Sequence, residues 1–265
     1  MKTNRQMAVL AALGCAVLGG GTALAVKGPG DGGIRNTPHD FSQYTWQFDP
    51  AGGAAQGQMC VPCHTPHKSN PYGFTPVSGS LPPLWNHQLK DGSAYTLSTF
   101  AGPGKANLNI KSLLCLGCHD GATALDAYGY MDGGGGNPGN AANKMGPNNI
   151  NTIGTDLSDD HPVGVYYPVS FTNNTSTSWG TLSATTGRSG TRSISEIHTS
   201  STDTNKMNSV TVYPTSTTGA DGNYTVECES CHQVHNNTYG TFLRFANNDP
   251  NNPSAMCVTC HVSKY

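Results

Sequence analysis

Residues 115–119 read CLGCH, and the same spacing recurs at 60–64 (CVPCH), 228–232 (CESCH) and 257–261 (CVTCH). Side chains three and four positions apart share one face of a helical turn. Two thiols at i and i+3 can therefore bond to the two vinyl groups of one haem, while the imidazole at i+4 reaches its iron. The pattern predicts four covalently bound haem c groups held by eight thiols: Cys60, Cys63, Cys115, Cys118, Cys228, Cys231, Cys257 and Cys260.

Paired cysteines have other uses in proteins, and these are the alternatives to haem. Structural zinc ions, redox dithiols, disulfides or iron–sulfur clusters could each use C-x-x-C pairs. None of them requires a histidine directly after every second cysteine. Histidine occupies 10 of 265 positions. Four such placements by chance therefore have a probability of order ~10⁻⁶, and haem attachment is favoured.

Each haem iron has two axial positions, and the chain has enough histidines to fill them all. Four are the motif histidines: His64, His119, His232 and His261. An internal repeat selects among the others, because each half of the chain reads as a leading histidine, then C-x-x-C-H-x-x-H, then C-x-x-C-H. The repeat predicts four further iron ligands: His39, His67, His161 and His235. His87 and His198 lie outside the repeat and are not expected to bind iron.

The position of His67 and His235 restricts which iron each can reach. Each lies three residues after a motif histidine, on the same side of the backbone, so neither can reach the opposite face of that same haem. We expect His67 to bind the iron of the haem at 115/118, and His235 the iron of the haem at 257/260. His39 and His161 are then left for the first and third haems.

The composition predicts little regular structure. Only 11% of residues are charged, against roughly 25% in a typical soluble protein. Apolar side chains are scarce, so haem faces would supply much of the buried apolar area. The expected fold class is a multihaem cytochrome c, mostly irregular loops with short helices at the CxxCH motifs and a few short β-hairpins, packed around four haems. The net charge of −2 argues against nucleic acid as a partner.

Four segments are expected along the chain. Residues 1–25 read as a signal peptide, because Lys2 and Arg5 precede an apolar stretch and Ala23-Leu24-Ala25 offers a cleavage site. Lipidation at Cys15 and an uncleaved membrane anchor are the alternatives, and no later segment is expected to span a membrane. The remaining segments are an N-terminal arm with the first haem pair (26–132), a Gly/Asn/Ser/Thr-rich segment with short strands that carries His161 (133–227), and the second haem pair (228–265). Short strands are expected within 163–170 and 209–213.

Several runs near the motifs resemble the doubled-CxxCH multihaem cytochromes. The resembling runs are Asn36-Thr37-Pro38-His39-Asp40, Cys63-His64-Thr65-Pro66-His67, Pro83-Leu84-Trp85-Asn86, 114–121, His161-Pro162-Val163-Gly164, Cys231-His232-Gln233-Val234-His235 and Phe242-Leu243-Arg244. The resemblance implies a periplasmic or extracellular electron carrier of the kind found in anaerobic, metal-respiring bacteria. Some tetrahaem relatives polymerise into extracellular filaments, in which a haem can take an axial histidine from the adjacent subunit.

Electron transfer without bond chemistry is the expected function. Irons with two histidine ligands change charge with little ligand rearrangement, and histidine in place of methionine implies low potentials. A multihaem reductase of nitrite or sulfite is the alternative, but it needs an iron with an open position, and here imidazoles outnumber the axial positions.

The expected partners are other copies of the chain, in a head-to-tail homopolymer, together with other redox proteins or extracellular electron acceptors. The expected location is extracellular or at the cell surface. A monomeric periplasmic shuttle is the alternative. Because His39 lies on an arm before the first motif, it is the residue expected to be donated across a subunit interface.

Overall fold

The computed structural model describes residues 33–44, 58–65, 67–76, 79, 81–97, 108–129, 137–167, 197–199, 207, 210–215, 224–246 and 255–260. The predicted signal peptide, 1–25, lies outside these residues, as does the motif histidine His261. None of the helices in the described ranges combines the length and the apolar character needed to cross a bilayer.

Three α-helices carry three of the four CxxCH motifs. They are α1 (Ile110–His119), α2 (Cys228–Cys231) and α3 (Ala255–Cys260). The first motif forms a turn instead, in which the amides of Cys63 and His64 both donate to the carbonyl of Cys60, at 3.1 and 2.7 Å. Short 3-10 helices occur in the loops: η1 (Phe41–Gln43), η2 (Gly92–Ala94) and η3 (Ala141–Asn143).

Helix α1 is the longest helix among the described residues, and local sequence explains both its start and its orientation. Asn109 caps it, since its side-chain oxygen accepts a hydrogen bond from the Lys111 amide at 3.1 Å. Ile110, Leu113 and Leu116 are buried at helical spacing on one face. That face joins the main hydrophobic cluster, whose other buried members are Trp85, Leu89, Tyr95, Leu108 and Leu157.

Within the described ranges, the strands are short and form three small sheets. The largest has the order β5 (Val165–Tyr167), β8 (Tyr224–Val226), β7 (Val210–Pro214) and β6 (Ile197–Thr199). Its β5–β8 and β8–β7 pairs are antiparallel and its β7–β6 pair is parallel. A parallel pair joins β1 (Thr96–Leu97) to β4 (Asp156–Leu157), and an antiparallel pair joins β2 (Ala127–Tyr128) to β3 (Asn137–Pro138).

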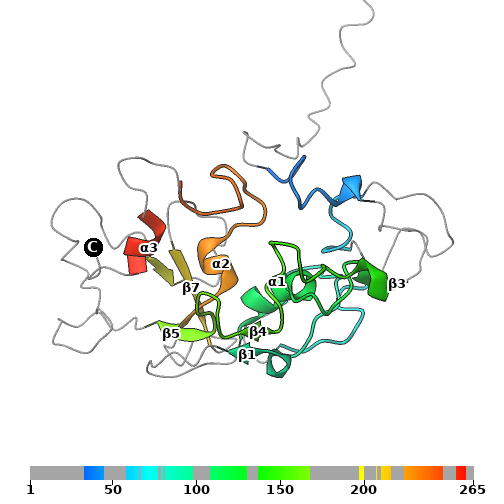
Figure 1. Ribbon diagram of the computed structural model, residues 1–265, viewed down its shortest axis with the longest axis horizontal. Coiled ribbons are helices and arrows are strands. Elements are labelled where there is room, and N and C mark those ends of the chain that lie inside the picture. Colours follow the sequence, from blue (N-terminus) through cyan, green and yellow to red (C-terminus); the bar gives the residue numbers. More distant parts are fainter. Residues whose placement is uncertain are drawn as a thin grey trace, which may run out of the picture.

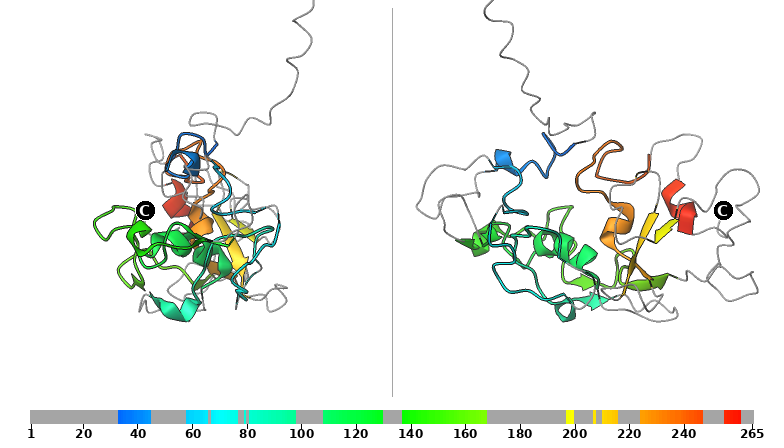
Figure 2. Two further views of the ribbon diagram at one scale, coloured as in Figure 1. Left: turned by 90° about the vertical axis from the view of Figure 1, so that its right-hand side faces the viewer. Right: turned by 180° about the vertical axis from the view of Figure 1, so that it is seen from behind.

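The motif-bearing helices follow one another along the long axis of the molecule. Figure 1 shows α1 near the centre, α2 beside it, then β7 and α3, and the view from behind in Figure 2 keeps this order. Helix α2 contacts both α1 and β7. Beyond β7, a second hydrophobic cluster joins Val210 and Phe245 to Met256 and Cys260 of α3. The second, third and fourth motifs therefore lie in chain order along the molecule.

Candidate haem-binding sites

The first and third motifs are followed by the same backbone arrangement. Isolated antiparallel bridges pair His64 with Trp85 and His232 with Leu243. On one side of the bridge, the Thr65 amide donates to the Leu84 carbonyl at 2.8 Å in the first motif. In the third motif, the Gln233 amide donates in the same way to the Phe242 carbonyl at 2.7 Å. On the other side, the Asn86 amide donates to the Cys63 carbonyl, and the Arg244 amide donates to the Cys231 carbonyl, both at 2.9 Å. The sequence repeat therefore corresponds to a repeat in structure.

A left-handed residue makes this arrangement possible in both halves. Leu84 and Phe242 occupy equivalent positions directly before the two bridge partners, with φ of 58–61°. Such a conformation is costly for a residue with a side chain, so it occurs where surrounding contacts stabilise it. Here the carbonyls of these two residues accept the amides of Thr65 and Gln233.

The motif histidines that the structure describes share one feature: their Nδ1 atom faces a backbone carbonyl oxygen. The Nδ1–oxygen distances are 3.2 Å from His64 to Pro83, 2.7 Å from His119 to Asn151 and 3.0 Å from His232 to Thr241. A carbonyl can only accept, so in the neutral ring Nδ1 carries the proton and Nε2 keeps its lone pair. Metal-binding histidines are typically oriented in this way.

Five imidazoles gather near the point where α1 and α2 meet. His39 and His119 have ring centres 6.1 Å apart, and His64 and His235 also have ring centres 6.1 Å apart. Burial, followed by the charge of His119, lowers the pKa of His39 to about 4. Partial desolvation also lowers the pKa of His232 and of His235, which both keep exposed surface. These rings are therefore kept neutral, which is the form that binds a metal.

Several of the motif thiols lie in surroundings that favour uncharged sulfur. Burial raises the pKa of Cys118 and Cys260 to about 12 and that of Cys231 to about 11, and it raises the pKa of Cys63 further. A thioether bond would replace each of these thiols with a sulfur that does not ionise. The paired thiols, the neutral imidazoles and the carbonyl-fixed rings together fit haem c, whose attachment needs two sulfurs and an Nε2 lone pair.

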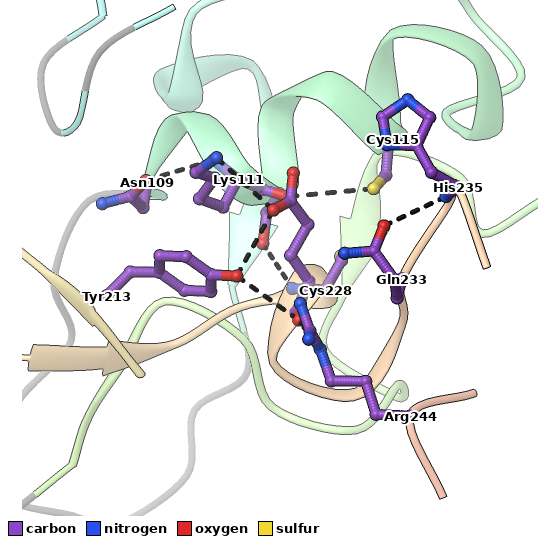
Figure 3. Close-up of polar contacts among 10 residues, drawn as sticks. Asn109, Lys111, Cys115, Tyr213, Cys228, Gln233, His235 and Arg244 are labelled. Carbon is purple, nitrogen blue, oxygen red and sulfur yellow. Dashed lines mark hydrogen bonds and ion pairs between the residues drawn. The ribbon is translucent and has the colours of Figure 1, made fainter. Parts of the chain in front are cut away.

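A polar network joins the second motif to the third. Ser112 of α1 donates its hydroxyl to the Glu227 carboxylate at 2.5 Å and accepts the Cys228 amide at 3.0 Å. Lys111 pairs with Glu229 at 3.4 Å. Figure 3 shows Lys111 and Cys115 on α1 facing Cys228 across this contact, with Tyr213 and Arg244 on the far side. The network holds the attachment cysteines of the two motifs next to each other.

Four predicted ligands are exposed among the described residues. They are His67, His161, His232 and His235. Of His198, the structure describes only its backbone in β6, where it pairs with Thr211. His235 faces His64, which differs from the sequence-based pairing with the haem at 257/260. The reason is tertiary, because the contact between α1 and α2 brings the loop after the third motif to the first motif.

The predicted donation of His39 to another subunit stays a prediction. Within the described chain, His39 folds back against His119, and its ring stacks on Phe242 with centres 4.5 Å apart. Local turn chemistry holds it there. The His39 amide donates to Thr37 Oγ1 at 3.2 Å, and the Asp40 carboxylate accepts the Asn36 amide at 2.7 Å.

His87 is buried, 2% exposed, and has a structural environment that its sequence position did not indicate. Its Nδ1 lies 2.8 Å from the Gln88 carbonyl, and its Nε2 lies 3.2 Å from the Leu125 carbonyl and 3.5 Å from Cys118 Sγ. The ring therefore packs beside the second motif, with a carbonyl near each nitrogen.

Sequence reasoning also missed the groups that orient the motif histidines. Two of them lie in or beside runs that the resemblance had singled out, Pro83-Leu84-Trp85-Asn86 and Phe242-Leu243-Arg244, so a signal existed. The third, the carbonyl of Asn151, is a backbone atom in an Asn-rich loop, and no side-chain pattern marks it.

Comparison with known proteins supports the chemistry of the second haem pair. A family model described as a doubled CXXCH motif matches residues 222–265, which contain the third and fourth motifs. No curated protein matches the chain. The doubled motif indicates covalently bound haem c and the electron-transfer activity typical of c-type cytochromes.

Proposed function

We propose that the chain is a tetrahaem c-type cytochrome that passes electrons along four haems with histidine ligands on both faces. The observation that carries the proposal is the shared geometry of His64, His119 and His232, each oriented by a backbone carbonyl at Nδ1. Bound haem would supply one-electron chemistry at its iron, with a potential tuned by its axial ligands.

The chain's own residues would hold, orient and insulate these groups. Two thiols of each motif would anchor one haem, and the motif imidazole would bind the iron through Nε2. Partial burial lowers the pKa of His39 and raises the pKa of Cys118, which favours the neutral ligand forms. Because short polar contacts hold α1 against α2, the second and third motifs stay adjacent, as electron transfer between the two halves of the chain requires.

The proposed context is extracellular electron transfer, with the chain as a subunit of a filament and with a monomeric periplasmic shuttle as the alternative. The motif order along the molecule supports a linear relay (Figure 1). A surface with few charges and many Asn, Ser, Thr and Gly residues opposes self-association only weakly. A head-to-tail contact that does not close into a ring produces an open polymer.

Intact-mass measurement of the denatured mature protein tests the haem number. Four haem additions are expected, because thioether bonds survive denaturation. Fewer than four additions in fully matured protein would contradict the tetrahaem proposal. The control is the Cys257→Ala/Cys260→Ala variant, which should carry three haems.

The ligand set is tested by spin state. All four irons should be low-spin in both oxidation states, and the reduced protein should not bind carbon monoxide rapidly. Rapid carbon monoxide binding by the native protein would favour a reductase instead, because it requires an open axial position.

A further inference from the structure

We propose that His235 is the second axial ligand of the iron held by His64, and that His39 is the second axial ligand of the iron held by His119. The inference rests on the proposed function, since it concerns haems attached at the first and second motifs. It states which imidazole completes which site, and it places a ligand from the second half of the chain on a haem of the first half.

The ring separations carry the assignment. A metal ion between two opposed imidazoles, with metal–nitrogen bonds of about 2 Å, holds the ring centres about 6 Å apart. Both pairs show this separation, 6.1 Å for His64–His235 and 6.1 Å for His39–His119. In each pair one ring belongs to a motif and is already oriented for metal binding through its Nδ1.

The second ring of each pair is held by its own turn. The His235 amide donates to the Gln233 side-chain oxygen at 3.0 Å, and Gln233 is only 5% exposed. Figure 3 shows this hydrogen bond beside α1, with the His235 ring above Cys115. His39 is fixed by its amide contact to Thr37 and by the stacked ring of Phe242. His235 and His39 are therefore each held in place without a contact from the motif histidine that they face.

The arrangement has a structural consequence. The iron at the first motif takes its second ligand from the loop after the third motif, so the first half of the chain alone cannot complete that site. Exposed His67 is the histidine that the repeat had assigned to the second haem, and in the structure His39 faces His119 in its place.

A haem-deletion cycle tests the assignment of His235. His235→Ala alone should leave four haems by mass and open one iron to carbon monoxide. Cys60→Ala/Cys63→Ala should leave three haems, and the number of carbon monoxide-binding irons in this variant is the reference for the next step. If His235 serves the first haem, adding His235→Ala to this three-haem variant should open no further iron. One additional carbon monoxide-binding iron in the combined variant would overturn the assignment. Wild-type protein with fewer than four haems would instead count against the proposed function.

Electron paramagnetic resonance of the four-haem protein gives a second readout that needs no haem deletion. The angle between axial imidazole planes sets the splitting of the iron's π-type d orbitals. Planes at 27°, as for His64–His235, should give a rhombic low-spin signal. Planes at 59°, as for His39–His119, should give a signal with a larger maximum g value. His235→Ala should remove a signal of the first kind and His39→Ala one of the second, whereas His67→Ala should leave both. Loss of either signal in His67→Ala, or its retention in the matching variant, would overturn the pairing.

Discussion

At the scale of single residues, backbone atoms rather than charged side chains orient the histidines. Each described motif ring faces a carbonyl at Nδ1. The carbonyl that faces His64 belongs to Pro83, directly before the left-handed residue Leu84, and the one that faces His232 belongs to Thr241, which is itself left-handed and precedes Phe242. The left-handed residues Leu84 and Phe242 have equivalent backbones but different surroundings. Leu84 is 45% exposed, whereas Phe242 is 8% exposed and stacks on His39.

Substitution by glycine should separate the backbone contribution from the packing contribution. Leu84→Gly should stay within about 1 kcal/mol of wild type, because relief of the left-handed conformation offsets the added chain entropy. Phe242→Gly should lose about 3 kcal/mol or more, since it also removes a buried ring. Urea unfolding of the two holoprotein variants measures both values. Equal losses would contradict the packing contribution assigned to the Phe242 ring.

At the scale of secondary structure elements, α1 and its contact with α2 form the centre of the molecule. Asn109 caps α1 through its side-chain oxygen, and its side-chain amide ties the start of the helix to β7 by donating to the Pro214 carbonyl at 2.9 Å. The four-residue helix α2 is too short to be stable alone. Its capping box, formed by Glu227 and Ser230, and its hydrogen bonds to Ser112 keep it in place.

The Asn109 cap of α1 should contribute more to the free energy of unfolding than an exposed asparagine cap. Asn109→Ala should destabilise the protein by about 1 kcal/mol or more, because it removes the cap and the tie to β7. Asn140→Ala is the matched control, since Asn140 caps only the exposed 3-10 helix η3 through the Ala142 amide at 2.9 Å. The control should cost less than about 0.5 kcal/mol. Comparable midpoints in chemical denaturation would contradict this ranking.

The buried carboxyl at the α1–α2 contact makes stability depend on pH. Burial raises the pKa of Glu227 from 4.5 to about 8, against the opposing hydrogen bond from Ser112. Between these values the folded state retains a proton that the unfolded state has released. The stability contribution is therefore complete below pH 4.5 and is lost as pH rises towards 8.

Glu227→Gln should remove this part of the pH dependence, because glutamine keeps an acceptor for Ser112 and does not ionise. The free energy of unfolding, measured across the same window, should fall with rising pH in wild type more steeply than in the variant. The variant should be the more stable protein at the upper end. Parallel curves would show that Glu227 does not titrate in this range.

At the scale of the whole molecule, the second, third and fourth motifs lie in chain order (Figure 1), and in the proposed ligand pairing the first half takes a ligand from the second. A filament would extend that row from subunit to subunit. His39 was the expected link between subunits, yet it lies against His119 of its own chain. Assembly should therefore not depend on its imidazole.

Electron microscopy of native secreted material tests this view of assembly. Wild-type protein should form filaments, and His39→Ala should still form them while one iron per subunit becomes open to carbon monoxide. Discrete monomers in wild-type material would favour the periplasmic shuttle. Dissolution of filaments in a His39→Ala protein that retains four haems would restore His39 as an intersubunit ligand.

The sequence by itself determined the attachment chemistry, because the two thiols and the imidazole of each motif lie within five consecutive residues. Such short-range geometry depends on the chain alone, and so does the order of motifs in the repeat. The resemblance also marked the runs that contain Trp85 and Leu243, although not what they do.

Only the tertiary structure decided which distant histidine faces which motif. The sequence repeat favoured pairs within each half, whereas His235 of the second half faces His64 of the first. Within the first half, the repeat assigned His67 to the second motif, but His39 is the histidine that faces His119. Spacing carries no information about these pairs, because they depend on how α1 packs against α2 and on where two loops turn. The same holds for the Asn151 carbonyl that orients His119, since any residue type can supply a backbone oxygen.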